Sequence, residues 1–248
     1  METAQQILID GDLLVWTEAA AIEYVVHWDN DIHTITCDFA ELKQRIDVKV
    51  IGLVEKFSAK KYTLAFSDPK SNFRNDVYPD YKANRKMVRK PLSYKDAVLY
   101  CHEVWGAGTW PNLEADDVLG ILATTDPEAV VISRDKDTRT VPCRWYNPSV
   151  SGEINVVSTE EADTFHLHQT LTGDRTDNYS GIPGVGPRSA DKILAKLPTW
   201  EAVVDAYHAA DMSEEEALVN ARCARICRQG DYDFKTGKVR LWSPKETP

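Results

Sequence analysis

Three short apolar runs, each ending in an aspartate, constrain the fold of this chain more than any other feature. They are QQILID (5–10), YTLAFSD (62–68) and AVVISRD (129–135). Their length and flanks are typical of buried strands, and helices are expected between the first two, over 17–28 and 38–58. Strands that alternate with helices predict an α/β fold with a mostly parallel sheet. Because sites in such sheets form outside the carboxyl ends of the strands, the three aspartates are expected at one edge.

Composition places the chain among ordinary globular proteins. Its 248 residues allow one large domain, or a domain with a smaller appendage, and 43% of them are hydrophobic and 27% charged. No apolar run approaches the roughly 20 residues of a membrane span, and the start METAQQILID has no basic leader. The five scattered cysteines, an odd number, favour reduced thiols over a disulfide framework.

Further carboxylates stand at the edges of the predicted elements. NLEADDVLGIL opens a helix with three acids, and SRDKD and GDRTD each add two. The whole set is Asp10, Asp68, Glu114, Asp116, Asp117, Asp135, Asp137, Asp174 and Asp177. Like charges about 4 Å apart repel by roughly 4 kcal/mol at an effective dielectric constant of about 20. Such a set therefore requires protonation, basic partners or divalent cations.

Hard oxygen donors with few histidines or cysteines nearby favour Mg²⁺ or Mn²⁺. Two such ions roughly 4 Å apart would support an in-line displacement at phosphorus. The alternative is a solvated acidic rim, in which the acids at helix starts are favoured by the helix dipole. An acidic rim of this kind explains any one of these acidic clusters better than it explains the whole set of nine acids.

A basic segment complements the acids, although the net charge is −10. Residues 70–90 carry seven basic and two acidic side chains, and YPDYKANRK interleaves Tyr78 and Tyr81 with Lys82, Arg85 and Lys86. Basic groups neutralise phosphates, and aromatic rings can stack on unpaired bases. The segment predicts a nucleic-acid surface, with a solvated basic helix face as the alternative.

Past residue 158 the pattern becomes helical. STEEADTFHLHQTL predicts a capped helix, further helices are expected near 199–209 and 213–228, and the tail predicts a hairpin that turns at KTGK. Between helices lies GIPGVG (181–186), a tight turn suited to contacting a phosphate backbone without reading bases. It is not a dinucleotide-binding fingerprint, because its spacing differs and no strand precedes it.

Taken in order, LIDGD, FSD, YKANR, EADD, SRDKD and GDRTDNYSGIPGVG resemble the motifs of the 5′-nuclease superfamily, which includes flap endonucleases and polymerase 5′-nuclease domains. The 5′-to-3′ exonucleases of short-tailed phages are the nearest likeness, through YKANRK, DNYSGI and DYDFKTGKVRLWSP. The resemblance implies a PIN-like core over 1–158, with a helical arch or clamp at 70–95. Residues 159–248 would then hold a helix–three-turn–helix element that binds DNA.

The resemblance also implies residue roles. The nine acids would hold two Mg²⁺ ions, for which Mn²⁺ can substitute, while Lys82 and Arg85 would stabilise charge at the scissile phosphate. Tyr81 would meet a terminal base. The implied DNA-binding set is Tyr81, Lys86, Arg89, Lys90, Gly181, Gly184, Gly186 and Arg188, with K⁺ at the hairpin in some relatives. Arg188 stands where relatives often have lysine, and Asp12 is expected to cap a helix.

The function expected from the resemblance is 5′-to-3′ exodeoxyribonuclease activity on duplex DNA in phage replication, recombination or host-DNA breakdown. Flap cleavage and activity on RNA–DNA hybrids are expected beside it. Whether ends or flaps are preferred, and whether the arch is closed or an open clamp, stays open. The rivals are a non-catalytic DNA-end-binding protein and a PIN-type ribonuclease. We expect a cytoplasmic protein, in the host cell if phage-encoded, without membrane contact, and with a single-stranded-DNA-binding protein or polymerase as partner.

Overall fold

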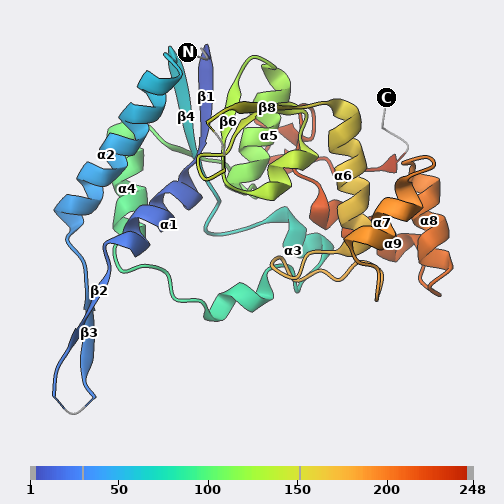
Figure 1. Ribbon diagram of the computed structural model, residues 1–248, viewed down its shortest axis with the longest axis horizontal. Coiled ribbons are helices and arrows are strands. Elements are labelled where there is room, and N and C mark those ends of the chain that lie inside the picture. The colour runs from blue at the N-terminus through green and yellow to red at the C-terminus, as the bar shows by residue number, and fades with distance from the viewer. Residues whose placement is uncertain (1–3, 30, 151, 245–248) are drawn as a thin grey trace.

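The computed structural model describes residues 4–29, 31–150 and 152–244, and a six-stranded sheet forms its centre (Figure 1). In spatial order the strands are β5 (Gly108–Thr109), β4 (Lys61–Phe66), β1 (Gln6–Asp10), β6 (Val130–Ile132), β7 (Cys143–Tyr146) and β8 (Ile154–Val157). Every neighbouring pair is parallel except β7 and β8. The predicted mostly parallel sheet is therefore confirmed.

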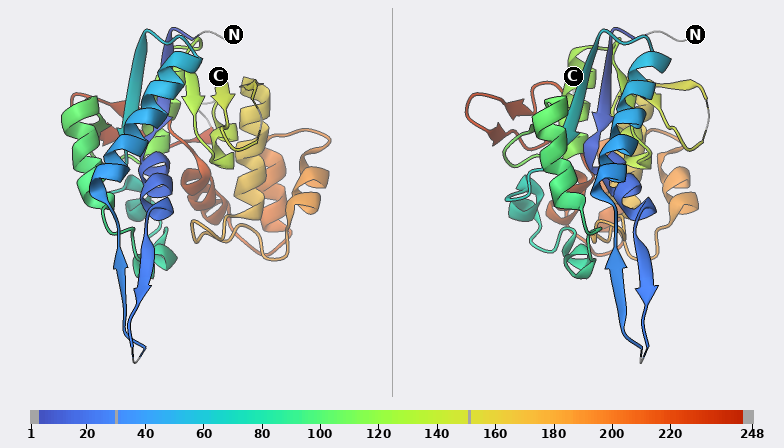
Figure 2. Two further views of the ribbon diagram at one scale, coloured as in Figure 1. Left: turned by 60° about the vertical axis from the view of Figure 1, so that its left-hand side comes forward. Right: turned by 90° about the vertical axis from the view of Figure 1, so that its left-hand side faces the viewer.

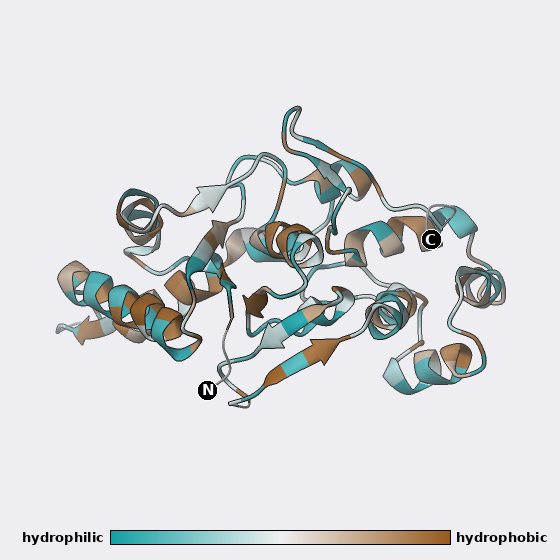
Figure 3. Cartoon of the chain, turned by 90° about the horizontal axis from the view of Figure 1, so that it is seen from above, coloured by the Kyte–Doolittle hydropathy of each residue, from teal (hydrophilic) through white to brown (hydrophobic). Residues whose placement is uncertain are grey.

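Helices cover both faces of this sheet (Figures 1 and 2). On one face lie α1 (Gly11–Ala21), α2 (Phe39–Lys56) and α4 (Tyr94–Trp105), and on the other lies α5 (Ala115–Thr125). Successive strand residues point to opposite faces, so Ile9 packs under the first group and Leu8 under α5. From above, the helices alternate hydrophobic and hydrophilic residues, as expected when one helix face is buried (Figure 3).

The helix expected over 17–28 is wrong in its second half. The first helix ends at Ala21, and β2 (Tyr24–His27) pairs with β3 (His33–Thr36) in an antiparallel hairpin that projects from the body (Figure 2). The β-branched residues of both segments favour extended chain. The helix expected over 38–58 forms as α2, and its N-cap, Asp38, accepts hydrogen bonds from the amides of Ala40 and Glu41.

Four helices form a second group beside the sheet, around an apolar cluster of their own (Figure 1). They are α6 (Thr159–Thr172), α7 (Pro187–Leu194), α8 (Trp200–His208) and α9 (Glu214–Ala224). Ser158 and Glu161 form the capping box that starts α6, and the chain turns repeatedly over 173–186 before α7 begins. The helix–three-turn–helix assignment itself stays a prediction.

After α9 the chain returns to the sheet. Ile226, Cys227 and Tyr232 are buried in the cluster beneath α5. The chain then forms the predicted hairpin, β9 (Tyr232–Asp233) with β10 (Lys238–Val239). The division into 1–158 and 159–248 stays a prediction.

The basic segment contains only short helical pieces. They are α3 (Phe73–Val77) and a 3₁₀ helix (Ala83–Met87), after which the chain runs to α4 with turns but no further helix. All five cysteines are free thiols. In the part of the chain that the structure describes, no helix is both long and apolar enough to cross a membrane.

Candidate active site at the carboxyl edge of the sheet

Two adjacent parallel strands and one helix bring three carboxylates together. Asp10 ends β1 and caps α1, with its carboxylate accepting hydrogen bonds from the Leu13 amide (3.0 Å) and the Ser133 hydroxyl (3.2 Å). Asp135 follows β6 and accepts from the Asp137 amide at 2.8 Å. Asp116 lies in the first turn of α5. We call Asp10, Asp116 and Asp135 the repelling group.

Burial and mutual repulsion raise the pKa values of carboxylates in and beside this group. Desolvation raises the pKa of Asp116 well above its usual value, and the charges of Asp10 and Asp135 raise it further. Burial raises the pKa of Asp10 to about 7. Neighbouring Asp137 also has a pKa raised to about 7, by burial and then by Asp135. No member of the repelling group has a salt-bridge partner among the described residues.

A second set of acids, which we call the paired group, consists of Glu114, Asp174 and Asp177. Lys82 binds Glu114 and lies 3.6 Å from Asp177, which also binds Arg85. Lys136 Nζ lies 2.8 Å from Asp174. Burial would raise the pKa of Glu114, but the charges of Lys82 and Arg74 outweigh it and lower that pKa to about 2.

The backbone fixes Lys82 over these acids. Its φ of 54° is left-handed, a conformation that costs a non-glycine residue about 1–2 kcal/mol. Its amide donates to the Asp177 carbonyl at 2.8 Å. The side chain therefore starts from a held position between Glu114 and Asp177.

Asp117 departs from its expected role as a metal ligand. Its side chain is fully buried and accepts two hydrogen bonds of 2.7 Å from Arg74. The amides of Glu114 and Cys227 donate to it as well, each at 3.1 Å. All its acceptor positions are in use, so Asp117 anchors Arg74 and the start of α5.

Asp12 differs from expectation, whereas the metal-binding role of Asp68 stays a prediction. Burial would raise the pKa of Asp68, but hydrogen bonds from Asn112, Lys70 and Ser71 outweigh it and lower that pKa. Asp12 does not cap α1, since Asp10 does; it accepts from the Ser67 amide at 2.9 Å and from the Tyr94 hydroxyl. Its charge raises the pKa of Asp10, so Asp12 adjoins the repelling group.

Tyr81 cannot meet a terminal base in this conformation. Only 3% of it is exposed, and its ring stacks on Tyr179 with 6.5 Å between centroids. Its hydroxyl lies 3.0 Å from Glu114 and 2.9 Å from Asp177, and so can donate to one of them at a time. Tyr81 therefore holds the paired group in place from the inside.

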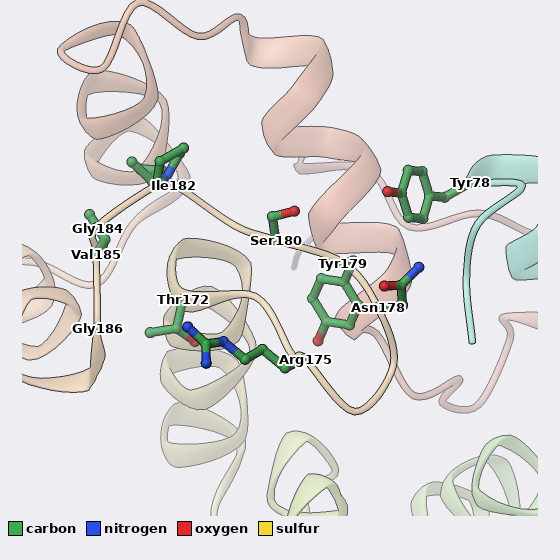
Figure 4. Close-up of a pocket in the computed structure, with 11 residues that line it drawn as sticks. Tyr78, Thr172, Arg175, Asn178, Tyr179, Ser180, Ile182, Gly184, Val185 and Gly186 are labelled. Carbon is green, nitrogen blue, oxygen red and sulfur yellow. The ribbon is translucent and has the colours of Figure 1, made fainter. Parts of the chain in front are cut away.

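The glycine-rich turn borders a cavity of about 610 Å³ (Figure 4). Tyr78, Arg175, Gly184 and Gly186 are among its lining residues. Gly184 has a φ of +80°, which glycine adopts readily. The sequence reading missed Arg175, although it stands inside GDRTD; its guanidinium is exposed and has no ion-pair partner in the described chain.

The other residues of the predicted DNA-binding set are dispersed. Buried Gly181 has a φ of +60°, and a Cβ there would lie 2.4 Å from the Gly173 nitrogen, whereas Arg188 is exposed in α7. Arg89 is bound by Glu23 at 2.6 Å, and Lys90 Nζ sits 4.5 Å from the centre of the Tyr94 ring. The side chain of Lys86 lies outside the described part of the structure.

The acids fit divalent cations by their chemistry. Across residues 4–29, 31–150 and 152–244, no three acidic, histidine or cysteine side chains are already arranged to hold a metal ion. However, the repelling group consists of hard oxygen donors whose charges raise the pKa values of Asp10 and Asp116, and a bound cation relieves such repulsion. Asp137 extends this donor set toward Asp174.

Comparison with known proteins decides the family. The family model described as 5′-3′ exonuclease, N-terminal resolvase-like domain, matches residues 6–162. The chain belongs to this family. It is 30% identical to the exodeoxyribonuclease of Enterobacteria phage T3 and to the exonuclease of Escherichia phage T7, in each case over 96% of this chain and 93% of the relative. This nuclease is thus an enzyme of the phage 5′-3′ exonuclease and flap endonuclease type.

Solved structures agree on the fold. The nuclease superposes on the phage T5 5′-exonuclease with bound zinc at a TM-score of 0.68, with 18% identity and 88% of each chain covered. A phage T5 flap endonuclease complex with DNA and metal ions gives a TM-score of 0.67 at 18% identity, covering 87% of each chain. The expected PIN-like nuclease fold is therefore confirmed.

Proposed function

We propose that the nuclease is a divalent-metal-dependent exodeoxyribonuclease that hydrolyses phosphodiesters from the 5′ ends of duplex DNA. The observation that carries this proposal is the juxtaposition of the repelling group with the cations Lys82 and Arg85 at one edge of the sheet. The acids offer donors for metal ions, and the cations offer charge for a phosphate. A non-catalytic DNA-binding protein would have no need of the carboxylate repulsion.

We propose that two Mg²⁺ ions, or Mn²⁺ in their place, are held by the repelling group and Asp137, with Asp174 and Asp177 at the margin. Bound there, such ions would supply an activated water and stabilise the leaving oxygen. Asp117 is left out of this set because Arg74 and two amides occupy its oxygens. We keep Asp68 outside the set as well, because its carboxylate already accepts hydrogen bonds from Lys70, Ser71 and Asn112.

Lys82 and Arg85 act on the phosphate in this proposal. Lys82 now neutralises Glu114 and Asp177, and Arg85 neutralises Asp177. A phosphate oxygen can replace those carboxylates as the acceptor of their hydrogen bonds. Positioned donors of this kind stabilise the charge that develops in the transition state. Tyr81 orients both acids from beneath and takes no part in stacking on DNA.

Duplex binding is proposed for the turn at 181–186 and its cavity. Backbone groups of Gly184 and Gly186, the Arg175 guanidinium and the Tyr78 ring line that cavity. Contacts of this kind address the phosphate backbone and not base edges, so flaps and RNA–DNA hybrids are also proposed substrates. A K⁺ ion at the turn, and a polymerase or single-stranded-DNA-binding partner, belong to the same proposal.

The test uses an internally labelled blunt duplex and a matching 5′-flap duplex, each with Mg²⁺ and with EDTA. We expect Mg²⁺-dependent shortening of the blunt duplex from its 5′ ends, and the ratio of the two rates ranks ends against flaps. Binding without cleavage at several metals and pH values would overturn the proposal in favour of an end-binding protein.

A further inference from the structure

A second cavity adjoins Asp10 on the side away from the glycine-rich turn. It has a volume of about 200 Å³ and lies between α1, α2 and the chain that follows β6. Its walls include Asp10, Leu14, Glu18, Lys49, Arg134 and Ser149, and we call it the α1 pocket. The proposed function uses only Asp10 of these residues.

The topology of the sheet makes this position a natural ligand site. From β1 the chain passes through α1 and α2 to β4 on one side, whereas β6 lies on the other side of β1. The pocket sits beside the ends of β1 and β6, where the strand order reverses. Open α/β sheets bind ligands in this crevice, outside the carboxyl ends of the strands.

The two cavities flank the acidic site. Tyr78 and residues between Thr172 and Gly186 line the cavity at the turn, whereas residues of α1, α2 and the chain after β6 line the α1 pocket. In Figure 1, α1 and α2 lie on the opposite side of the sheet from α6 and α7. Asp116 lies between the two cavities. Its carboxylate interacts electrostatically with Asp10 and Asp135, and also with Lys82 and Glu114. A strand held at the turn and cut near Asp116 would therefore extend toward the α1 pocket.

The walls of the pocket suit one nucleotide. Leu13, Leu14 and Ile132 offer apolar surface to a base. Glu18, which Arg45 binds at 2.8 Å, offers an acceptor. A volume of about 200 Å³ equals that of six or seven liquid waters at about 30 Å³ each, which suits one base-sized group.

Two cations stand where a terminal phosphate would bind. Arg134 is exposed and has no ion-pair partner within the described residues, and Lys49 lies 3.8 Å from Glu18 with 55% of its side chain exposed. Neither cation forms a short ion pair with another described residue. Their charge is therefore available to an anion at the pocket mouth.

We propose that the α1 pocket binds the 5′-terminal nucleotide of the strand being cut, with its 5′-phosphate at Arg134 and Lys49. This inference rests on the proposed function and adds a rule for product length. Water attacks the phosphorus and the P–O3′ bond breaks, so the terminal nucleotide leaves with a 3′-hydroxyl and the shortened strand keeps a new 5′-phosphate. A pocket for one base thus sets the mononucleotide as the main product.

Two surface variants test the pocket. Arg134→Ala removes the phosphate contact, and Ser149→Trp narrows the mouth from an exposed loop. Lys61→Ala, an equal loss of charge at the amino end of β4, is the matched control. Each protein cuts blunt duplexes with a 5′-phosphate or a 5′-hydroxyl, and products are separated by length under single-turnover conditions.

We expect the wild type and Lys61→Ala to prefer the 5′-phosphate and to release mononucleotides. Arg134→Ala should lose about tenfold in rate on the phosphorylated end only, and Ser149→Trp should shift products to longer fragments. Unchanged end preference and product length in both variants would overturn the pocket while leaving the proposed function intact. A wild type that cuts no duplex would overturn both.

Binding gives a readout that does not depend on cleavage. Thymidine 5′-monophosphate, titrated in EDTA, should bind the wild type and Lys61→Ala at least tenfold more tightly than Arg134→Ala. Inorganic phosphate serves as the second probe and should bind far more weakly, because it lacks the base. Equal binding of the nucleotide to wild type and Arg134→Ala, or no binding to either, would contradict the proposal.

Discussion

The paired group and the repelling group lie side by side in the site, but their carboxylates have different surroundings. Glu114, Asp174 and Asp177 are each held by a lysine or arginine at close range. Asp10, Asp116 and Asp135 form no ion pair within the described residues, and the charge of Lys82 offsets only part of the rise in the pKa of Asp116. Acidic side chains therefore stabilise the fold in the paired group and destabilise it in the repelling group.

That difference separates positioning from metal binding. A paired carboxylate orients its cation, and here the cations are those that would face a phosphate. An unpaired, crowded carboxylate has a raised pKa and an affinity for external positive charge. If the account is right, substitutions in the two groups must change different properties.

The largest effect is expected from Asp116→Asn in the repelling group. Cleavage should fall by about 10³-fold or more, because a donor for the metal is lost, while duplex binding is largely retained. In EDTA at pH 8 the variant should be more stable than the wild type, by on the order of 1 kcal/mol, since a repulsion is removed. Single-turnover cleavage and urea unfolding measure both.

Asp96→Asn is the matched control, because Asp96 is also a first-turn aspartate but is exposed on α4. It should leave both quantities at their wild-type values. Cleavage by Asp116→Asn within tenfold of the wild type would remove Asp116 from the metal-binding set.

Arg74→Ala should have the next largest effect, on stability. It leaves Asp117 charged and fully buried without its partner, which costs about 3–5 kcal/mol. Urea unfolding measures the loss. Arg144→Ala, which breaks a 3.6 Å pair with exposed Glu128, should cost less than about 1 kcal/mol. Equal losses for the two variants would refute the anchoring role of Asp117.

Lys82→Ala tests the cation side of the paired group. The single-turnover rate should fall by about 10²-fold, the usual cost of one transition-state donor, with a much smaller change in duplex affinity. Lys82→Arg should restore part of the rate. An unchanged rate in Lys82→Ala would place Lys82 outside catalysis.

A pH dependence of stability in EDTA is the last effect that we expect. Folding raises the pKa of Asp10 and Asp137 from 3.8 to about 7, so the folded state resists their ionisation. Their contribution is favourable below about pH 4 and is lost as the pH rises to about 7. The double variant Asp10→Asn/Asp137→Asn should therefore gain stability over the wild type across that window, and a gain independent of pH would contradict the account.

The sequence predicted the sheet because apolar runs and their flanks are local signals. It also located Asp10 and Asp135, since parallel neighbours end at the same edge. It failed where partners come from distant segments: Arg74 meets Asp117 across 43 residues, and the ring of Tyr81 is buried against Tyr179. Spacing shows where a side chain leaves its element but not which side chain it meets.

The 17–28 segment failed for a different reason. Its apolar residues are compatible with a helix, but in the structure Val25 pairs with Ile35 in a hairpin. A pairing between two separate segments cannot be read from the pattern of one segment. Arg175 was missed because two acids flank it in sequence, which hides a cation that faces the cavity at the turn.

The central claim is that the repelling group binds divalent cations, and a metal titration tests it most directly. Metal-stripped wild type, Asp116→Asn and Asp96→Asn would each be titrated with Mn²⁺ at pH 8 without DNA, by calorimetry and by thermal unfolding. We predict saturable binding and a raised melting temperature for the wild type and Asp96→Asn, with at least tenfold weaker binding for Asp116→Asn. Equal binding by all three proteins, or no binding by the wild type, would contradict the account.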